Sequence, residues 1–136
     1  MNASPPSAPE TARVSAEQLR LHFLVSPRET EGDWLEVVAD AVRGGVSLVQ
    51  LRNKHDTKQE CVKQARKLRE LLKPLGVPLI VNDSHEIADA ANADGVHLGQ
   101  SDTPPAQVRQ QLPQLIIGYS IDSPRQLHTQ REQCQA

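Results

Sequence analysis

The sequence has little of several residue types that mark specialised protein classes. Aromatic residues make up only 2% of the 136-residue chain, so its core must be built from Leu, Val, Ile and Ala. The only two cysteines, Cys61 and Cys134, are far apart, which excludes a Cys-x-x-Cys redox motif or a zinc site built on close cysteine pairs. We predict that both are buried, reduced thiols.

Charge and hydropathy exclude further classes. A net charge of -2 leaves no basic excess for a nucleic-acid surface. No run approaches the roughly 20 apolar residues of a membrane helix, and the N-terminus lacks the pattern of a secretory signal. We therefore expect a cytoplasmic protein with neither a nucleic acid nor a membrane as partner. Residues 1–17, rich in Pro, Ser and Ala, are predicted to be a disordered leader.

Beyond the leader, short apolar runs alternate with helical patterns. The runs are typical of strands buried on both faces and cover residues 21–26, 46–52, 77–81, 95–98 and 115–120. Helices are predicted between them, beginning at N-cap residues Asp33, Thr57, Ser84, Thr103 and Ser123, the last two each followed by a proline. Five β-α units require right-handed crossovers and a parallel sheet, so the fold class is α/β.

Two architectures fit this order of elements. A doubly wound sheet of five strands would be complete at this length. A TIM (β/α)₈ barrel needs eight units and roughly 200 residues or more, so the chain would be a barrel truncated after about five βα units.

Polar residues gather where the predicted strands end. They are Gln50, Arg52, Lys54, Asn82, Asp83, Gln100, Asp102 and Ser120. In a parallel sheet these ends share one face. Arg and Lys bind phosphate and carboxylates hold Mg²⁺, so the set indicates a phosphorylated ligand with a divalent cation.

Each residue also has a purely structural interpretation. Asp83 and Asp102 could be helix caps, Arg52 and Lys54 could lie in a solvated loop, and Ser120 could be a structural hydroxyl. His97 lies inside an apolar run, where a hydrogen-bonded core histidine is the alternative to a functional one. Only the joint occurrence of these residues on one face favours a site.

Four segments carry a resemblance to a known family. The strings GGVSLVQLRNK (44–54), GVPLIVND (76–83), ADGVHLGQSD (93–102) and IIGYS (116–120) resemble thiamine phosphate synthases, in that family's order and spacing. The resemblance implies a (β/α)₈ barrel, of which residues 18–136 would form the N-terminal part. It also implies an enzyme that joins a pyrimidine methyl diphosphate to a thiazole phosphate and releases pyrophosphate.

The resemblance implies roles for particular residues. Gln50, Arg52, Lys54 and Asn82 match positions that bind the pyrimidine diphosphate, His97 and Gln100 belong to a shared block, and Ser120 matches a serine near the diphosphate. Of these, Arg52, Lys54 and Ser120 are the expected catalytic residues. Asp83 and Asp102 match the Mg²⁺ carboxylates.

The chain also departs from the family pattern. Ser101 stands where the family usually has an acidic residue, and Asp122 where it has histidine. The later glycine-rich and Phe-Pro-Thr segments, which hold the thiazole phosphate, are absent. We expect the chain to be completed by a missing C-terminal segment or to form a homo-oligomer. A non-catalytic half-barrel binding module and a thiazole tautomerase-like relative are the alternative functions.

Overall fold

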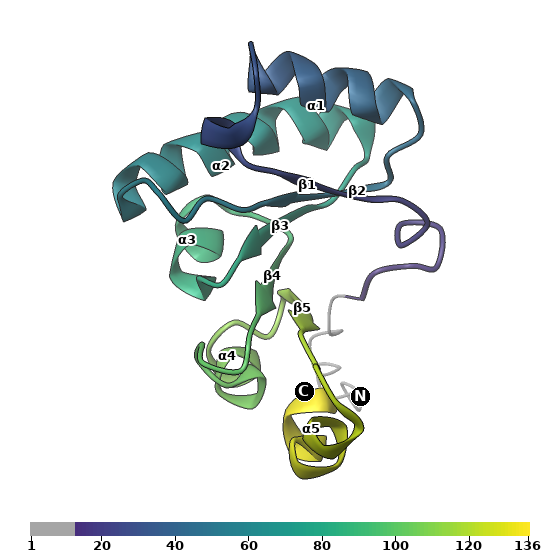
Figure 1. Cartoon of the computed structure of the whole chain (residues 1–136), viewed down its shortest axis with the longest axis vertical. Helices are drawn as coiled ribbons and strands as arrows, with labels where there is room; N and C mark the ends of the chain where they lie inside the picture. The colour runs from purple at the N-terminus through teal and green to yellow at the C-terminus, as the bar shows by residue number, and fades with distance from the viewer. Residues whose placement is uncertain (1–12) are drawn as a thin grey trace, which may run out of the picture.

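Five parallel strands alternate with helices in chain order in the computed structural model, which describes residues 13–136 (Figure 1). The strands are β1 (His22–Val25), β2 (Leu48–Leu51), β3 (Leu79–Asn82), β4 (Gly95–Leu98) and β5 (Ile116–Tyr119). The helices are η1 (Pro27–Glu29), α1 (Trp34–Arg43), α2 (Lys58–Leu72), η2 (Lys73–Leu75), α3 (His85–Ala90), α4 (Pro105–Gln111), α5 (Pro124–Thr129) and α6 (Arg131–Cys134).

The order of the strands decides between the two predicted architectures. The sheet runs β1-β2-β3-β4-β5, and every neighbouring pair is parallel. In a doubly wound sheet the order in which strands are added reverses at a switch point, whereas in a barrel each strand is added beside the one before it. The α/β prediction with barrel-type winding is therefore confirmed. Helices α1 to α4 lie along one side of the sheet, and the segment before β1 lies on the other (Figure 1).

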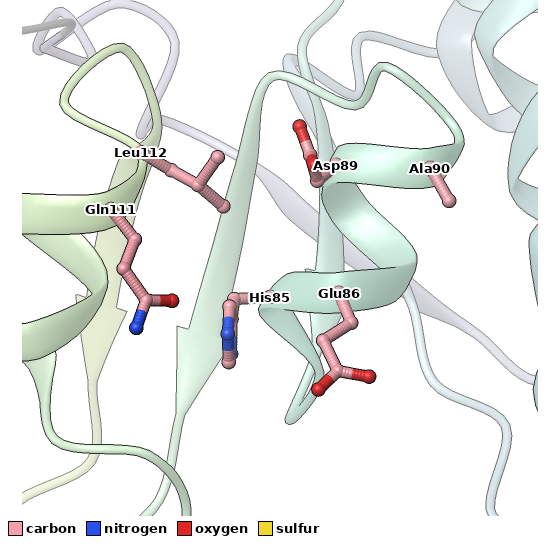
Figure 2. A pocket seen from close by; sticks show the side chains of 6 residues that line it. All are labelled: His85, Glu86, Asp89, Ala90, Gln111 and Leu112. Atoms are coloured by element: carbon pink, nitrogen blue, oxygen red, sulfur yellow. The ribbon is translucent and has the colours of Figure 1, made fainter.

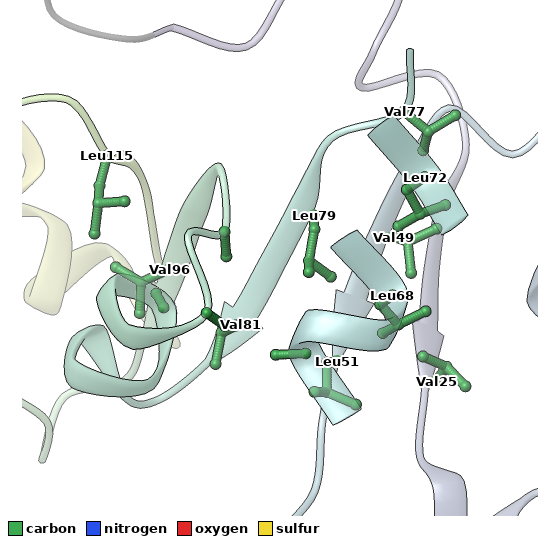
Figure 3. Close-up of a cluster of buried hydrophobic side chains, with 14 of the residues drawn as sticks. Val25, Val49, Leu51, Leu68, Leu72, Val77, Leu79, Val81, Val96 and Leu115 are labelled. Carbon is green, nitrogen blue, oxygen red and sulfur yellow. The ribbon is translucent and has the colours of Figure 1, made fainter. Parts of the chain in front are cut away.

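The hydrophobic core lies between the sheet and these helices. Successive strand residues point to opposite faces, so alternate residues of each strand pack against the helices. Figure 3 shows this layer around Leu68 and Leu72 of α2. Its strand members include Val25, Val49, Leu51, Leu79, Val81, Val96 and Leu98, all at most 3% exposed. This aliphatic layer agrees with the scarcity of aromatic residues.

Four of the five predicted helix caps are confirmed. The side chains of Asp33, Thr57, Ser84 and Ser123 accept hydrogen bonds from backbone N–H groups of the first turns of α1, α2, α3 and α5. The prediction for Thr103 is wrong, because α4 begins at Pro105 with Pro104 as its N-cap. A residue followed by proline is disfavoured in the helical region, so Pro104 stays extended and the helix begins one residue later.

The predicted leader lies mostly outside the described residues. For residues 1–12 disorder stays a prediction. Closer to β1 the chain forms a turn in which Ser15 N donates to Gln18 Oε1 (2.8 Å) and Gln18 N donates to Ser15 Oγ (3.2 Å). This reciprocal pair is a capping box, which satisfies two backbone donors at once.

Two predictions from composition have different outcomes. Cys61 is a buried free thiol, as expected, but Cys134 is exposed, so the prediction that both are buried is wrong. Cys134 ends the four-residue helix α6, which has no buried residue. Within residues 13–136, no helix combines the length and apolar character needed to cross a membrane.

Candidate functional site

A row of polar side chains crosses the sheet on the face opposite the helical layer. Each strand, or the residue directly after it, contributes one member: His22, Gln50, Asn82, His97 and Ser120. The last four were predicted as site residues, whereas His22 was missed. The feature that could have revealed His22 is its position in β1. His22 lies two residues before Leu24, and Leu24 pairs with Gln50, so His22 is on the same face of the sheet as Gln50. Side chains two residues apart in a strand share a face.

The first three members are joined by their side chains. The Nδ2 atom of Asn82 lies 2.9 Å from Oε1 of Gln50, and Nε2 of Gln50 lies 3.2 Å from Nε2 of His22. Gln50 is only 2% exposed and is the one buried polar residue among those described. Burying an amide is costly unless its groups are hydrogen-bonded, so these contacts satisfy Gln50. Its contact with a ligand stays a prediction.

The other two members form a pair across β4 and β5. The Nε2 atom of His97 lies 2.8 Å from Oγ of Ser120. His97 is opposite Gly118 in the register, and a Cβ at Gly118 would collide with Nδ1 of the His97 ring. Burial lowers the pKa of His97, and the carboxylates of Asp83 and Asp102 oppose that shift only in part. The imidazole is therefore a neutral hydrogen-bonding group at neutral pH.

The two predicted metal carboxylates follow β3 and β4. Asp83 has a positive φ of 69°, and its backbone N–H donates to the carbonyl of His97 (2.7 Å). A non-glycine residue in this region is uncommon and is often found at functional sites. The cap of α3 is Ser84 and not Asp83. Asp102 accepts a hydrogen bond from Gly99 N through Oδ2 (2.7 Å).

Lys54 and Asp83 lie together at the strand ends. The Nζ atom of Lys54 is 3.2 Å from Oδ2 of Asp83, and both side chains are partly exposed. The backbone N–H of Arg52 donates to the carbonyl of Val25 (2.9 Å), while its side chain is exposed. Gln100 donates from Nε2 to the carbonyl of Ser120 (2.7 Å). The structure thus brings Lys54 to Asp83 and Gln100 to Ser120.

The loop that carries Arg52 and Lys54 is fixed by a residue that the sequence analysis missed. Asp56 has a side chain only 8% exposed and accepts hydrogen bonds from Arg28 Nε (2.6 Å), Asn53 Nδ2 (2.6 Å) and Gln64 Nε2 (3.1 Å). These donors, Arg28 foremost, hold the pKa of Asp56 well below its usual range. No motif pointed to this residue, since its partners come from η1, the loop and α2.

The carboxylates at the strand ends meet only part of what a Mg²⁺ site requires. Within residues 13–136 no group of three His, Cys, Asp or Glu side chains converges as a metal site. Asp83 directly follows β3 and Asp102 lies in the loop after β4, so both belong to the carboxyl ends of neighbouring parallel strands. Mg²⁺ is usually bound by one or two carboxylates together with substrate phosphates and waters. Two carboxylates therefore fit this ion when a diphosphate supplies further oxygens.

Two hollows lie apart from the strand ends. One, of about 280 Å³, lies on the same face as the polar row and is bounded by apolar residues such as Leu48, Ile80 and Ile116. Figure 2 shows the other, about 410 Å³, between α3 and α4. Its lining holds none of the predicted site residues: His85, Glu86, Asp89, Ala90, Gln111 and Leu112.

Known proteins resemble this chain in sequence and in fold. Residues 21–135 match the family model for thiamine monophosphate synthase. A thiamine-phosphate synthase of Xanthobacter autotrophicus is 47% identical over 108 residues, covering 78% of this chain and 51% of the relative. One of Albidiferax ferrireducens is 44% identical over 112 residues, covering 81% and 51%. The chain spans about half the length of these curated relatives.

A solved structure supports the same assignment. A thiamine phosphate pyrophosphorylase from Pyrococcus furiosus superposes with a TM-score of 0.77 at 29% identity, covering 86% of this chain and 57% of that one. The sequence motifs, the consecutive parallel strands and these matches agree. The chain belongs to the thiamine monophosphate synthase family.

Proposed function

We propose that this chain carries the pyrimidine-diphosphate half of a thiamine phosphate synthase site. The observation that supports it most is one convergence at the carboxyl ends of the strands. There Lys54 pairs with Asp83, and the backbone N–H of Asp83 donates to the carbonyl of His97. Asp102 accepts a hydrogen bond from Gly99, directly after β4. Cationic groups, carboxylates and a hydroxyl are what a diphosphate bound with a divalent cation requires.

The diphosphate is the leaving group of the proposed reaction. The bond between the pyrimidine methylene carbon and the diphosphate oxygen breaks, and pyrophosphate departs with the electron pair. Arg52 and Lys54 neutralise the charge that develops on the phosphate oxygens, and the Ser120 hydroxyl donates a hydrogen bond to them. A hydroxyl that also meets the neutral His97 ring at 2.8 Å has its orientation restricted.

The carboxylates of Asp83 and Asp102 would hold Mg²⁺ on the diphosphate. When bound, the ion supplies positive charge that stabilises the departing pyrophosphate. Lys54, 3.2 Å from Asp83, would add a second positive charge next to the same diphosphate.

No covalent nucleophile from the protein is needed for bond formation. The electron-rich aminopyrimidine stabilises the benzylic-type cation left on its methylene carbon, and the thiazole nitrogen attacks that carbon with its lone pair. The protein contributes positioning and electrostatic stabilisation. We place this reaction in the cytoplasm, with the thiazole phosphate bound by groups beyond those assigned above.

The test is turnover with both substrates. The chain is mixed with the pyrimidine diphosphate, thiazole phosphate and Mg²⁺, alone and with the C-terminal half of a relative, and thiamine phosphate and pyrophosphate are quantified. Equal amounts of the two products, lost in Ser120→Ala with Arg52→Ala, support the proposal. Product formation that is unaffected by these substitutions contradicts it.

A second candidate is a binding module without turnover. It is favoured by the pairing of Lys54 with Asp83 at 3.2 Å, since such a pair can bind a diphosphate whether or not turnover follows. Diphosphate binding without product in both mixtures would support the module over the enzyme. A tautomerase-like relative is less well supported, since it has no use for the paired Lys54 and Asp83 beside a diphosphate.

A further inference from the structure

The direction of the hydrogen bonds along Gln50 and Asn82 has a consequence for His22. A primary amide presents an oxygen acceptor at one corner and a nitrogen donor at the other, and a half-turn of the amide exchanges them. In one direction Asn82 donates to Gln50, and Gln50 donates to His22. In that direction, however, the oxygen of Asn82 faces both carboxylate oxygens of Asp83 at 3.1 Å. Two acceptors in contact repel each other.

The opposite direction removes this repulsion. With Asn82 turned, its nitrogen donates to Oδ1 and Oδ2 of Asp83 (3.1 Å each), and its oxygen faces Oε1 of Gln50 at 2.9 Å. Because an amide oxygen cannot donate, Gln50 must turn as well. Gln50 then donates to Asn82, and its own oxygen faces Nε2 of His22. Hydrogen bonds to a carboxylate are roughly twice as strong as neutral ones, so Asp83 selects this direction.

We propose that His22 is a positioning residue, which donates a hydrogen bond from Nε2 into a hydrogen-bond network that runs from His22 through Gln50 and Asn82 to Asp83. The network crosses β1, β2 and β3 and fixes the orientation of both amides. Gln50 is 2% exposed, so in this proposal it influences a ligand only by orienting the amide of Asn82. The neutral imidazole carries its proton on Nε2 in this arrangement.

The surroundings of His22 favour a neutral ring. His22 is exposed at the sheet surface, but its partial desolvation and the facing His97 both lower its pKa. A neutral histidine has one donor nitrogen, and His22 is the only member of this hydrogen-bond network that can donate to the buried oxygen of Gln50. Leaving a buried acceptor unsatisfied is costly, so the proton is held on Nε2.

The role in ligand binding rests on the proposed function. If Asn82 contacts the pyrimidine diphosphate, His22 determines which amide atom Asn82 presents to it. We expect His22→Leu to weaken binding of that diphosphate roughly tenfold, because the amides lose their fixed direction. We expect His22→Gln, which still offers an N–H donor, to restore most of the affinity.

The decisive test needs no ligand. In the ¹⁵N-labelled 136-residue chain at pH 8, the two ring nitrogens of His22 report which one carries the proton, and His22→Leu assigns their signals. We expect the proton of the His22 ring to be on Nε2. We expect Asp83→Asn, which lies two amide side chains away from His22, to shift part of the molecules to the tautomer protonated on Nδ1. Asp102→Asn is the matched control and should leave His22 unchanged.

Either of two results overturns the proposal. One is an unprotonated Nε2 in the unsubstituted chain, and the other is a His22 signal indifferent to Asp83→Asn. If the His22 ring is protonated on Nε2 and responds to Asp83→Asn but the diphosphate does not bind, the hydrogen-bond network is supported and the proposed function fails. The two failures are therefore separable.

Discussion

The Nε2 atom of His97 lies 2.8 Å from the hydroxyl oxygen of Ser120, 23 residues further along the chain. The pair forms because β4 and β5 are neighbours in register, with His97 opposite Gly118. The glycine leaves room for the imidazole ring over β5. A backbone position thus determines whether the serine, proposed to meet the leaving group, has a partner.

The first prediction concerns that space. In Gly118→Ala the new Cβ would collide with the His97 ring, so the ring must move. Overpacking of this kind costs about 1–3 kcal/mol, which denaturant unfolding measures. The matched control is Gly44→Ala at the end of α1, where the nearest atom would be 3.3 Å away and the effect should be smaller. Equal stability of the two variants would contradict the steric explanation.

The second prediction concerns pH. Desolvation lowers the pKa of the half-buried His97, and of the more exposed His22, below the ordinary value of 6.5. Between the folded and ordinary values the unfolded chain binds more protons, so acid favours unfolding. The free energy of unfolding should therefore fall as pH drops below 6.5 and be unaffected by these groups above it. His97→Gln should flatten this slope, and a slope unchanged in that variant would refute the assignment.

The third prediction concerns the lysine at the strand ends. Lys54→Met removes a cation that contacts Asp83 and, in the proposal, the diphosphate. Hydrogen bonds to charged groups contribute about 1.5–3 kcal/mol, so affinity for the pyrimidine diphosphate should fall roughly tenfold or more. Lys58→Met is the control, because Lys58 pairs with Glu86 on the surface between α2 and α3. Comparable losses in both variants would indicate a non-specific charge effect.

The fourth prediction concerns the loop between β2 and α2. Asp56→Ala leaves Arg28, Asn53 and Gln64 without their shared acceptor, so the melting temperature and the diphosphate affinity should both fall. Asp40→Ala removes an exposed carboxylate paired with Arg43 on α1 and should change neither. Full affinity in Asp56→Ala would show that the loop holds its shape without this residue.

The fold was largely predictable because its signals are local. Apolar runs, caps such as Asp33 and the repeated β-α order each follow from short stretches of sequence. Thr103 failed as a cap because two consecutive prolines moved the helix start, a competition between two local rules. Strand order was not readable from periodicity alone, since both architectures share the same elements.

The site was predictable only where a motif or a strand end marked it. Lys54 and Asp83 were both expected at this edge, and the structure brings them to 3.2 Å. His22 was missed because its partner Gln50 is 28 residues away, and Asp56 because its partner Arg28 is 28 residues away, with no motif to connect either pair. Such long-range polar contacts depend on register and winding, which the sequence pattern does not determine.

The measurement that tests the central claim most directly is calorimetric titration of this chain with 4-amino-2-methyl-5-pyrimidinylmethyl diphosphate, with Mg²⁺ and with a chelator. The proposed site predicts binding that requires Mg²⁺ and is lost when Asp83→Asn and Asp102→Asn are combined. Absence of binding, or binding that is the same with the chelator and in the double variant, would contradict it.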